Sequence, residues 1–387
     1  LNPIRRVKTF SEALSLAKDD DTIELHKNII EAVEITKNII IKGNGNTWTT
    51  PSTKVAIVAK VPIELYDIKF KVPTRSIALS LQTSATLDKI NLSQEGPIRE
   101  FFPTAQLLSG EFKIYNSEIM GLQASKDTVC EVVDSTFLSY YKGDVFLPTG
   151  DDMSVFYGQT HMTNCTLRSV RLLGKSTINS STIKKFVNLD ADSTLSDLVL
   201  DIETSVVKKN WAKKEPDNGP LRKATDARYG LYIYKSTVKI SGYDVINASE
   251  DFTGITAINA NLTIDNVDRD DYATPINHTI SSSAVTFEDS NDTAYWYLDN
   301  SQASFVRSRI NSNQTHESAR EKLDKMIGLE SVKSKIKSMV NTIEMNRGTQ
   351  NENFEFAYNM IFAGNPGTGK SVVAKLFAET LFEIGVI

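Results

Sequence analysis

Apolar and polar positions alternate with two different periods along the 387-residue chain. Near the N-terminus, Thr9 and Glu12 fit a capping box, and apolar residues at helical spacing follow them, so we expect a short amphipathic helix there. After the three aspartates at positions 19–21 the period changes to two, which is typical of strands. Short alternating segments separated by turn residues fill most of the remaining chain, so the pattern predicts a mainly β fold.

These segments form a repeat, in which two or three turn residues and a further apolar position follow each apolar–x–apolar unit. Successive units lie about 15 to 30 residues apart, except for two gaps near 43 residues, and this is the spacing expected of a solenoid. Each coil of a solenoid buries its inward apolar residues only by stacking on the next coil. Asn, Ser and Asp at the corners would supply turns and side-chain ladders. Examples begin at residues 63, 85, 112, 130, 161, 176, 193, 236, 261 and 304.

The opening stretch, FSEALSLAKDDDTIEL followed by ITKNIIIKGNGN, resembles the start of right-handed parallel β-helices of the pectin-lyase type. This resemblance implies such a β-helix over residues 1–312. A β-sandwich is the competing interpretation. It should show hairpin signals such as Asn-Gly between strands, and these signals are scarce.

Two segments within the repeats need separate interpretations. Residues 208–223 are polar, locally basic and rich in Pro and Gly around Trp211, so we expect a loop that projects from the solenoid. That loop is either simply solvated or binds a protein partner or a polyanion. Tyr295, Trp296 and Tyr297 alternate as in a strand, so we expect one face of this segment to lie in the core. An exposed aromatic patch is the alternative interpretation.

Polar residues without an apolar period cover positions 311–318 and end the solenoid pattern. We therefore divide the chain into a β-helix domain at 1–312, a linker at 313–323 that continues into a helix near Ala319–Lys325, and a second module at 324–387.

The second module contains a phosphate-loop motif, which has a glycine, four intervening residues and then Gly-Lys-Ser. Glycines let the backbone curl closely around phosphates, so that several N–H groups converge on them. The lysine would supply charge to the outer phosphates and the serine hydroxyl a ligand for Mg²⁺. The motif therefore predicts ATP and Mg²⁺ as ligands. Its residues are Gly364, Asn365, Pro366, Gly367, Thr368, Gly369, Lys370 and Ser371.

The residues on either side of the motif support this interpretation. Residues 359–363 read as a short buried strand. After the motif, Val373, Leu376, Phe377, Thr380 and Leu381 recur at helical spacing. We therefore expect a strand–loop–helix unit in which the N-terminus of the helix faces the anion.

A second motif, LDKMIGLESVK at positions 323–333, precedes a helix with one apolar face. Together with NMIFAGNPGTGKSVVAKLF, it resembles the AAA+ ATPases, specifically the CbxX/CfqX subfamily. In that family the segment matching Ile327 and Gly328 lies against adenine, so the resemblance assigns this role to those two residues. It also implies a homo-oligomeric ring that remodels proteins or serves secretion.

The family's acidic motif, sensor residue and arginine finger have no match before Ile387. Because phosphoryl transfer depends on such groups, we expect no ATP turnover by this chain alone. The chain also begins with Leu1 rather than Met, so we expect it to be a piece of a longer cytoplasmic ATPase. The β-helix would recognise or scaffold that ATPase's protein target.

The composition of the chain argues against several classes of function and of site. The net charge of −5 argues against nucleic-acid binding, and no apolar run is long enough to span a membrane. The two cysteines, Cys130 and Cys165, have neither disulfide-framework nor zinc spacing, so we expect single buried thiols.

A polysaccharide-binding or polysaccharide-cleaving β-helix is the rival function. Residues 150–152 (Gly-Asp-Asp), His161, Arg171 and Lys175 resemble a polygalacturonase set, but Asp152 and His161 lie too close in sequence to come from successive coils. Paired carboxylates act on a glycosidic bond only from opposite sides of it. Residues 268–271 are an alternative calcium site, with a solvated turn as the simpler interpretation.

Overall fold

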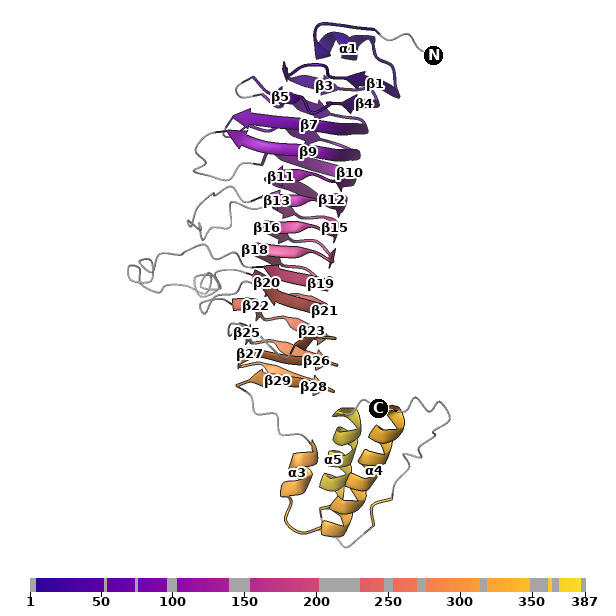
Figure 1. Ribbon diagram of the computed structural model, residues 1–387, viewed down its shortest axis with the longest axis vertical. Coiled ribbons are helices and arrows are strands. Elements are labelled where there is room, and N and C mark those ends of the chain that lie inside the picture. Colours follow the sequence, from indigo (N-terminus) through magenta and orange to yellow (C-terminus); the bar gives the residue numbers. More distant parts are fainter. Residues whose placement is uncertain are drawn as a thin grey trace, which may run out of the picture.

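The computed structural model describes residues 5–51, 54–73, 76–95, 103–138, 154–201, 230–246, 253–269, 276–313, 319–348, 361–363 and 369–383. A long stack of short strands comes first, and a small group of helices follows it (Figure 1). Strands dominate, so the chain is mainly β, as the alternating pattern predicts.

The strands wind in coils that stack on one another. Throughout the described residues, neighbouring strands pair in parallel. A β-sandwich is built from antiparallel hairpins, so that alternative is wrong. The strands are β1 (Asp21–Glu24), β2 (Ile29–Ile30), β3 (Val33–Ile35), β4 (Ile39–Lys42), β5 (Thr47–Thr49), β6 (Ile57–Ala59), β7 (Ile63–Pro73), β8 (Leu79–Leu81), β9 (Ala85–Glu95), β10 (Ala105–Tyr115), β11 (Glu118–Met120), β12 (Leu122–Val133), β13 (Thr136–Leu138), β14 (Ser154–Phe156), β15 (Gln159–Thr163), β16 (Thr166–Leu172), β17 (Ser176–Asn179), β18 (Thr182–Leu189), β19 (Ser193–Asp201), β20 (Gly230–Tyr234), β21 (Thr237–Ile246), β22 (Thr253–Ile258), β23 (Asn261–Asp265), β24 (Asp268–Arg269), β25 (Asn277–Ser281), β26 (Ala284–Glu288), β27 (Asn291–Asp299), β28 (Gln302–Val306) and β29 (Arg309–Ser312).

The pairings define three sides of the coil. One side runs through β15, β17, β19, β21, β23, β26 and β28. A second side runs through β14, β16, β18, β20, β22, β25 and β27. The third side includes β2, β5, β11 and β13. Long strands such as β7 bend from one side to the next, because their two halves pair with different strands.

Polar residues turn the chain at the corners of the coils. Asn116 and Asp134 occupy equivalent positions in successive coils and both adopt left-handed backbone conformations, with φ of 49° and 52°. A buried serine follows each of them. Ser117 Oγ accepts the Ile90 N–H of the preceding coil at 3.0 Å, and Ser135 Oγ accepts the Ser117 N–H at 3.1 Å. The side-chain ladders expected at the corners are thus confirmed.

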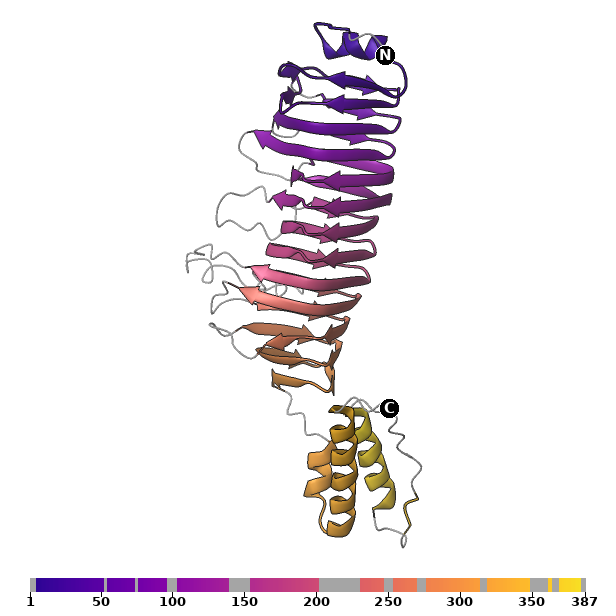
Figure 2. The ribbon, with the colours of Figure 1, turned by 45° about the vertical axis from the view of Figure 1, so that its right-hand side comes forward.

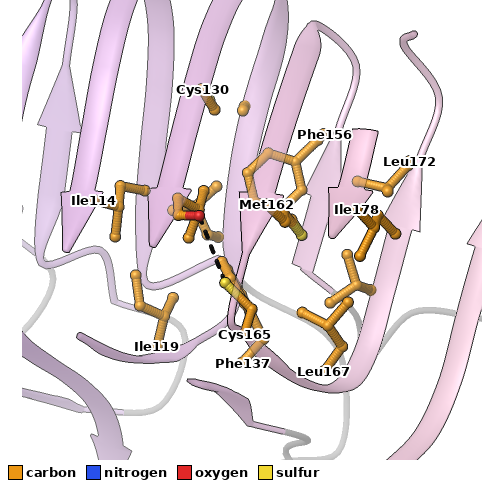
Figure 3. Close-up of a cluster of buried hydrophobic side chains, with 14 of the residues drawn as sticks. Ile114, Ile119, Cys130, Phe137, Phe156, Met162, Cys165, Leu167, Leu172 and Ile178 are labelled. Atoms are coloured by element: carbon orange, nitrogen blue, oxygen red, sulfur yellow. Dashed lines mark hydrogen bonds between the residues drawn. The ribbon is translucent and has the colours of Figure 1, made fainter. Parts of the chain in front are cut away.

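Apolar side chains and both cysteines fill the interior of the stack (Figure 3). Cys130 and Cys165 are unpaired and buried, as the sequence predicts. Burial raises the pKa of the Cys130 thiol to about 12 and that of Cys165 to about 11. The Cys165 thiol donates to the Val132 carbonyl oxygen at 3.6 Å. Both groups therefore remain protonated thiols that contribute to packing.

The helix α1 (Phe10–Leu16) lies over the first coil (Figures 1 and 2). Its N-cap is Thr9, whose Oγ1 accepts the Glu12 N–H at 3.1 Å, so the predicted start of this helix is confirmed. The Phe10 ring lies 4.7 Å from the ring of buried Trp48. This apolar contact joins the helix to the core of the stack.

At the other end, α3 (Ala319–Lys325), α4 (Glu330–Gly348) and α5 (Lys370–Glu383) pack together beyond the last coil (Figures 1 and 2). Among the described residues these helices have a hydrophobic core separate from that of the stack, and α5 contacts β28. We call this group the helical unit. Among the residues that the structure describes, its buried apolar residues are Ala319, Leu323, Ile336, Val340, Val373, Leu376, Phe377 and Leu381.

Two predictions need comment. The alternation at Tyr295, Trp296 and Tyr297 is confirmed, because Trp296 is buried and the two tyrosines are exposed. The strand predicted at 359–363 is not formed over 361–363, where the chain has no regular structure and Ile361 is exposed. A strand requires a hydrogen-bonding neighbour, and none lies beside this segment in the described chain. Residues 208–223, 150–152 and 270–271 lie outside the described residues.

Candidate functional site

The phosphate-loop motif ends at the start of a helix. Gly364, Asn365, Pro366, Gly367 and Thr368 lie outside the described residues, whereas Gly369, Lys370 and Ser371 are described. Gly369 has a φ of 78°, a backbone conformation that is strained in residues with a side chain. The helix α5 begins at the next residue. The Gly369 carbonyl accepts the Val373 N–H at 2.9 Å.

This arrangement leaves the first amides of a 14-residue helix without partners inside that helix. Amides of this kind, together with the positive end of the helix dipole, favour an anion. Ser371 is exposed in the first turn. The residue types and their placement therefore fit a phosphate group.

The predicted adenine segment forms the turn between α3 and α4. Ile327 is fully exposed. Gly328 has a φ of 76°, and a methyl group added to it would meet no atom within 4 Å. Open space thus lies beside an exposed apolar side chain.

The same turn reaches the end of the phosphate loop. A Cβ added to Gly369 would lie 3.4 Å from Met326 Cε. The Met326 methyl group therefore lies near the residue immediately before Lys370. The structure brings together two motifs that lie more than 30 residues apart in the sequence.

Lys333 fixes the position of this turn. Its ammonium group, largely buried, donates to the Asp324 carbonyl oxygen and to Glu330 Oε1, both at 3.1 Å. Lys337 forms an ion pair with the Asp324 carboxylate at 2.8 Å. These contacts tie the end of α3 to the first turns of α4 on either side of Ile327.

Sequence reasoning missed Met326 and Lys333. Met326 directly precedes the Ile327–Gly328 pair, but one sequence does not show that a methionine will contact a loop far along the chain. Lys333 follows the pattern of a solvated helix face, and only its burial reveals the structural contacts.

In the described ranges, no cluster of His, Cys, Asp and Glu could hold a metal ion. Ser371 offers one oxygen ligand. Mg²⁺ bound with a nucleotide usually takes most of its remaining ligands from water and phosphate oxygens, so a single protein ligand is compatible with such a site.

Two residues of the rival enzyme set, His161 and Arg171, lie on different sides of the coil, and residues 150–152 of that set lie outside the described residues. His161 lies on β15, where its ring nitrogens contact Gln159 Nε2 at 2.8 Å and Thr177 Oγ1 at 2.6 Å. Arg171 lies on a different side of the coil and forms an ion pair with Asp190 at 2.6 Å. These two groups therefore do not share one side of the coil.

The chain matches no protein-family model, and neither a curated protein nor a solved structure matches it. Within the described residues, no helix combines the length and the apolar character needed to cross a bilayer.

Proposed function

We propose that this chain is part of a cytoplasmic ATP-binding protein of the AAA+ type, related to the CbxX/CfqX subfamily. In this proposal the stack of coils is a right-handed parallel β-helix of the pectin-lyase type that holds a protein target, and the helical unit begins the AAA+ module. The parent protein remodels proteins or serves secretion, and it acts as a homo-oligomeric ring.

The proximity of Met326 to Gly369 carries the proposal. A nucleotide needs one surface for its base and another for its phosphates, separated by the length of the ribose. The Ile327–Gly328 turn and the start of α5 offer an apolar surface and an anion-binding surface next to each other. The motif sequences gave these two segments their roles, and their proximity agrees with those roles.

Each residue has one task in this site. The backbone N–H groups of Gly367 and Gly369 would bind the phosphates, and the Lys370 ammonium group would neutralise the charge of the outer ones. The Ser371 hydroxyl binds Mg²⁺, which offsets phosphate charge when bound. Ile327 and Gly328 take the adenine. The partner surface would be the faces of the coils, with residues 208–223 as a contributing loop.

The direct test is a titration of the chain with a fluorescent ATP analogue in the presence of Mg²⁺. We expect weak binding and no hydrolysis, because in the described part of the helical unit no strand stands beside the phosphate loop to supply an acidic Mg²⁺ ligand. Lys370→Ala should weaken binding by about tenfold or more, since a charge-assisted contact is lost. Lys375→Ala is the matched control, because that side chain is exposed one turn further along α5.

A second variant separates the two halves of the site. Ile327→Ser should weaken the binding of ATP but not that of inorganic triphosphate, because only the base contacts residue 327. Unchanged ATP affinity in Lys370→Ala would contradict the proposal. Equal losses for ATP and triphosphate in Ile327→Ser would contradict the role of the turn.

A further inference from the structure

The last coils of the stack enclose a group of polar and aromatic side chains that the proposed function does not use. His278 on β25, Tyr243 on β21, and Asp292 and Trp296 on β27 are all buried. The His278 ring lies 4.2 Å from the Trp296 ring and 5.7 Å from the Tyr243 ring, measured between centroids. We call these four residues the histidine cluster.

The hydrogen bonds of the cluster run in one direction. The Ile255 backbone N–H can only donate, and it lies 3.0 Å from His278 Nδ1. Nδ1 must therefore be the acceptor, which places the proton of the neutral ring on Nε2. Nε2–H then donates to the Tyr243 oxygen at 3.1 Å, and the Tyr243 hydroxyl donates to Asp292 Oδ2 at 2.5 Å.

Asp292 ends this chain of hydrogen bonds and is well supplied with donors. Its carboxylate also accepts the Trp296 indole N–H and the Ala294 backbone N–H, both at 2.9 Å. A buried network whose members are all paired stabilises one arrangement, whereas the loss of one partner leaves a costly unpaired group. The protonation state of His278 thus determines whether the network is complete.

The cluster lies one strand away from the end of the stack. Trp296 on β27 pairs with Ser312 on β29, the last strand before the helical unit. The Asn313 side chain accepts the Leu298 N–H at 2.7 Å and donates to the Leu298 carbonyl oxygen at 3.1 Å. Any shift of β27 would therefore reach the segment that leads to α3.

We propose that the histidine cluster is an acid-sensitive lock, in which protonation of His278 releases the last coils, β25 to β29, and with them the anchor of the helical unit. An imidazolium ring carries a proton on Nδ1 that points at the Ile255 N–H. That hydrogen bond is lost, and two donors then face each other in the core.

The electrostatic surroundings set the direction of the effect. Burial lowers the pKa of His278 from 6.5 to about 4, and the charge of Asp292 opposes that shift. Tyr243 from β21 and Asp292 from β27 are the titratable groups that face the ring among the described residues, and β22 presents only a backbone amide. The unfolded coil binds the proton more readily than the folded coil, so stability is complete above pH 6.5 and falls between pH 6.5 and 4.

Hydrogen exchange of the intact chain from pH 7 to pH 4, corrected for the intrinsic pH dependence of exchange, tests this lock. The protection factors of the backbone amides in β25 to β29 should fall on the order of 100-fold at pH 4, whereas the protection factors in β7 to β12 should not change. In His278→Asn the amide oxygen can still accept the Ile255 N–H but no longer titrates, so the extra loss should disappear. Tyr243→Phe keeps His278 and should keep the pH dependence from a lower starting protection.

Nitrogen chemical shifts of ¹⁵N-labelled histidine give an independent readout that needs no stable variant. His278 should show the Nε2–H tautomer at pH 7 and stay neutral to about pH 5. Protonation near pH 6.5 in the folded protein would overturn the proposal. An acid-induced loss of protection that persists in His278→Asn, or that affects β7 to β12 equally, would overturn it as well.

Discussion

The stack of coils and the helical unit bury apolar residues on different scales. In the stack one core continues from Phe10 to Phe305, and each inner coil is covered by the coils on both sides. In the described part of the helical unit three helices share a core with eight buried apolar residues. Hydrogen bonds between the strands also join each coil of the stack to the next. Near the helices, by contrast, the large apolar side chains of Ile327 and Ile361 are exposed.

This contrast suggests a division of labour. The large part consists of repeated packing, and its buried thiols and corner serines have structural partners. The residues with the chemistry of a ligand site lie on the part with the smaller core. Binding segments are commonly drawn from the regions of lowest local stability, because they must open or adapt to a ligand.

Removal of the helical unit is the strongest test of this independence. A chain that ends at Asn313 should lose most of its helical circular dichroism, since only α1 remains, but keep a β spectrum and a cooperative melt, because each coil is stabilised by its neighbours. Thermal melts followed at several wavelengths would measure this. If the shortened chain is unfolded at 25 °C, the two parts depend on each other and the comparison fails.

The choice of the last residue supplies a matched control. A chain that ends at Ser312 lacks the Asn313 side chain, which makes two hydrogen bonds to the Leu298 backbone. Each such bond contributes about 1 kcal/mol. The 312-residue chain should therefore melt roughly 2–4 °C below the 313-residue chain.

Equivalent core deletions sharpen the comparison. Phe287→Ala in the stack and Phe377→Ala in α5 should each cost about 3–5 kcal/mol, because both rings are buried. The stack should keep its fold with a lower melting temperature, whereas the helical unit should lose its helical signal, since it has few other core contacts. Val372→Ala, at an exposed position of α5, is the control and should change little.

Circular dichroism at 25 °C and urea melts would separate these outcomes. If Phe377→Ala leaves the helical signal intact, the unit has more stability than its small core suggests. If Phe287→Ala removes the β signal completely, the coils do not support one another as their stacking implies.

The sequence predicted the stack because its information is local and repeated. Inward positions recur in every coil, and residues such as Asn116 and Asp134 mark the corners by their tolerance of left-handed backbone. The histidine cluster could not be predicted, because the alternation of apolar and polar residues indicates that His278 and Asp292 point inward but does not identify their partners. Tyr243 lies 35 and 49 residues away from them.

In the candidate site, too, the features set by local sequence could be predicted, whereas the features set by packing could not. The helix that begins at Lys370 follows from a local motif and is confirmed. The proximity of Met326 to Gly369 depends on how α3 and α5 pack, and one sequence does not contain that packing. The strand expected before the loop was wrong over 361–363 because a strand depends on neighbours, whereas its apolar pattern is local.

The smallest expected effect concerns the capping helix α1, whose two ends are held by charged side chains from the coil beneath. The Glu31 carboxylate accepts the backbone N–H groups of Phe10 and Ser11 at 2.8 and 2.9 Å. Lys37 Nζ donates to the carbonyl oxygens of Leu14 and Ala17 at 2.9 and 2.6 Å. A negative charge thus faces the positive N-terminal end of the helix dipole, and a positive charge faces its negative C-terminal end.

Glu31→Gln should therefore lower the free energy of unfolding by about 1 kcal/mol, whereas Glu34→Gln, which breaks only the exposed pair with Lys60, should change it by less than about 0.5 kcal/mol. Burial raises the pKa of Glu31, but the hydrogen bonds from Phe10 and Ser11 outweigh that effect and lower it below 4.5. The contribution is thus present above pH 4.5 and is lost as the pH falls through the folded-state pKa. Urea melts of both variants at pH 7 and pH 3 would measure it. If the two variants differ from the parent chain equally at pH 7, the coil does not hold α1 through Glu31, and the contact of Phe10 with Trp48 must anchor the helix instead.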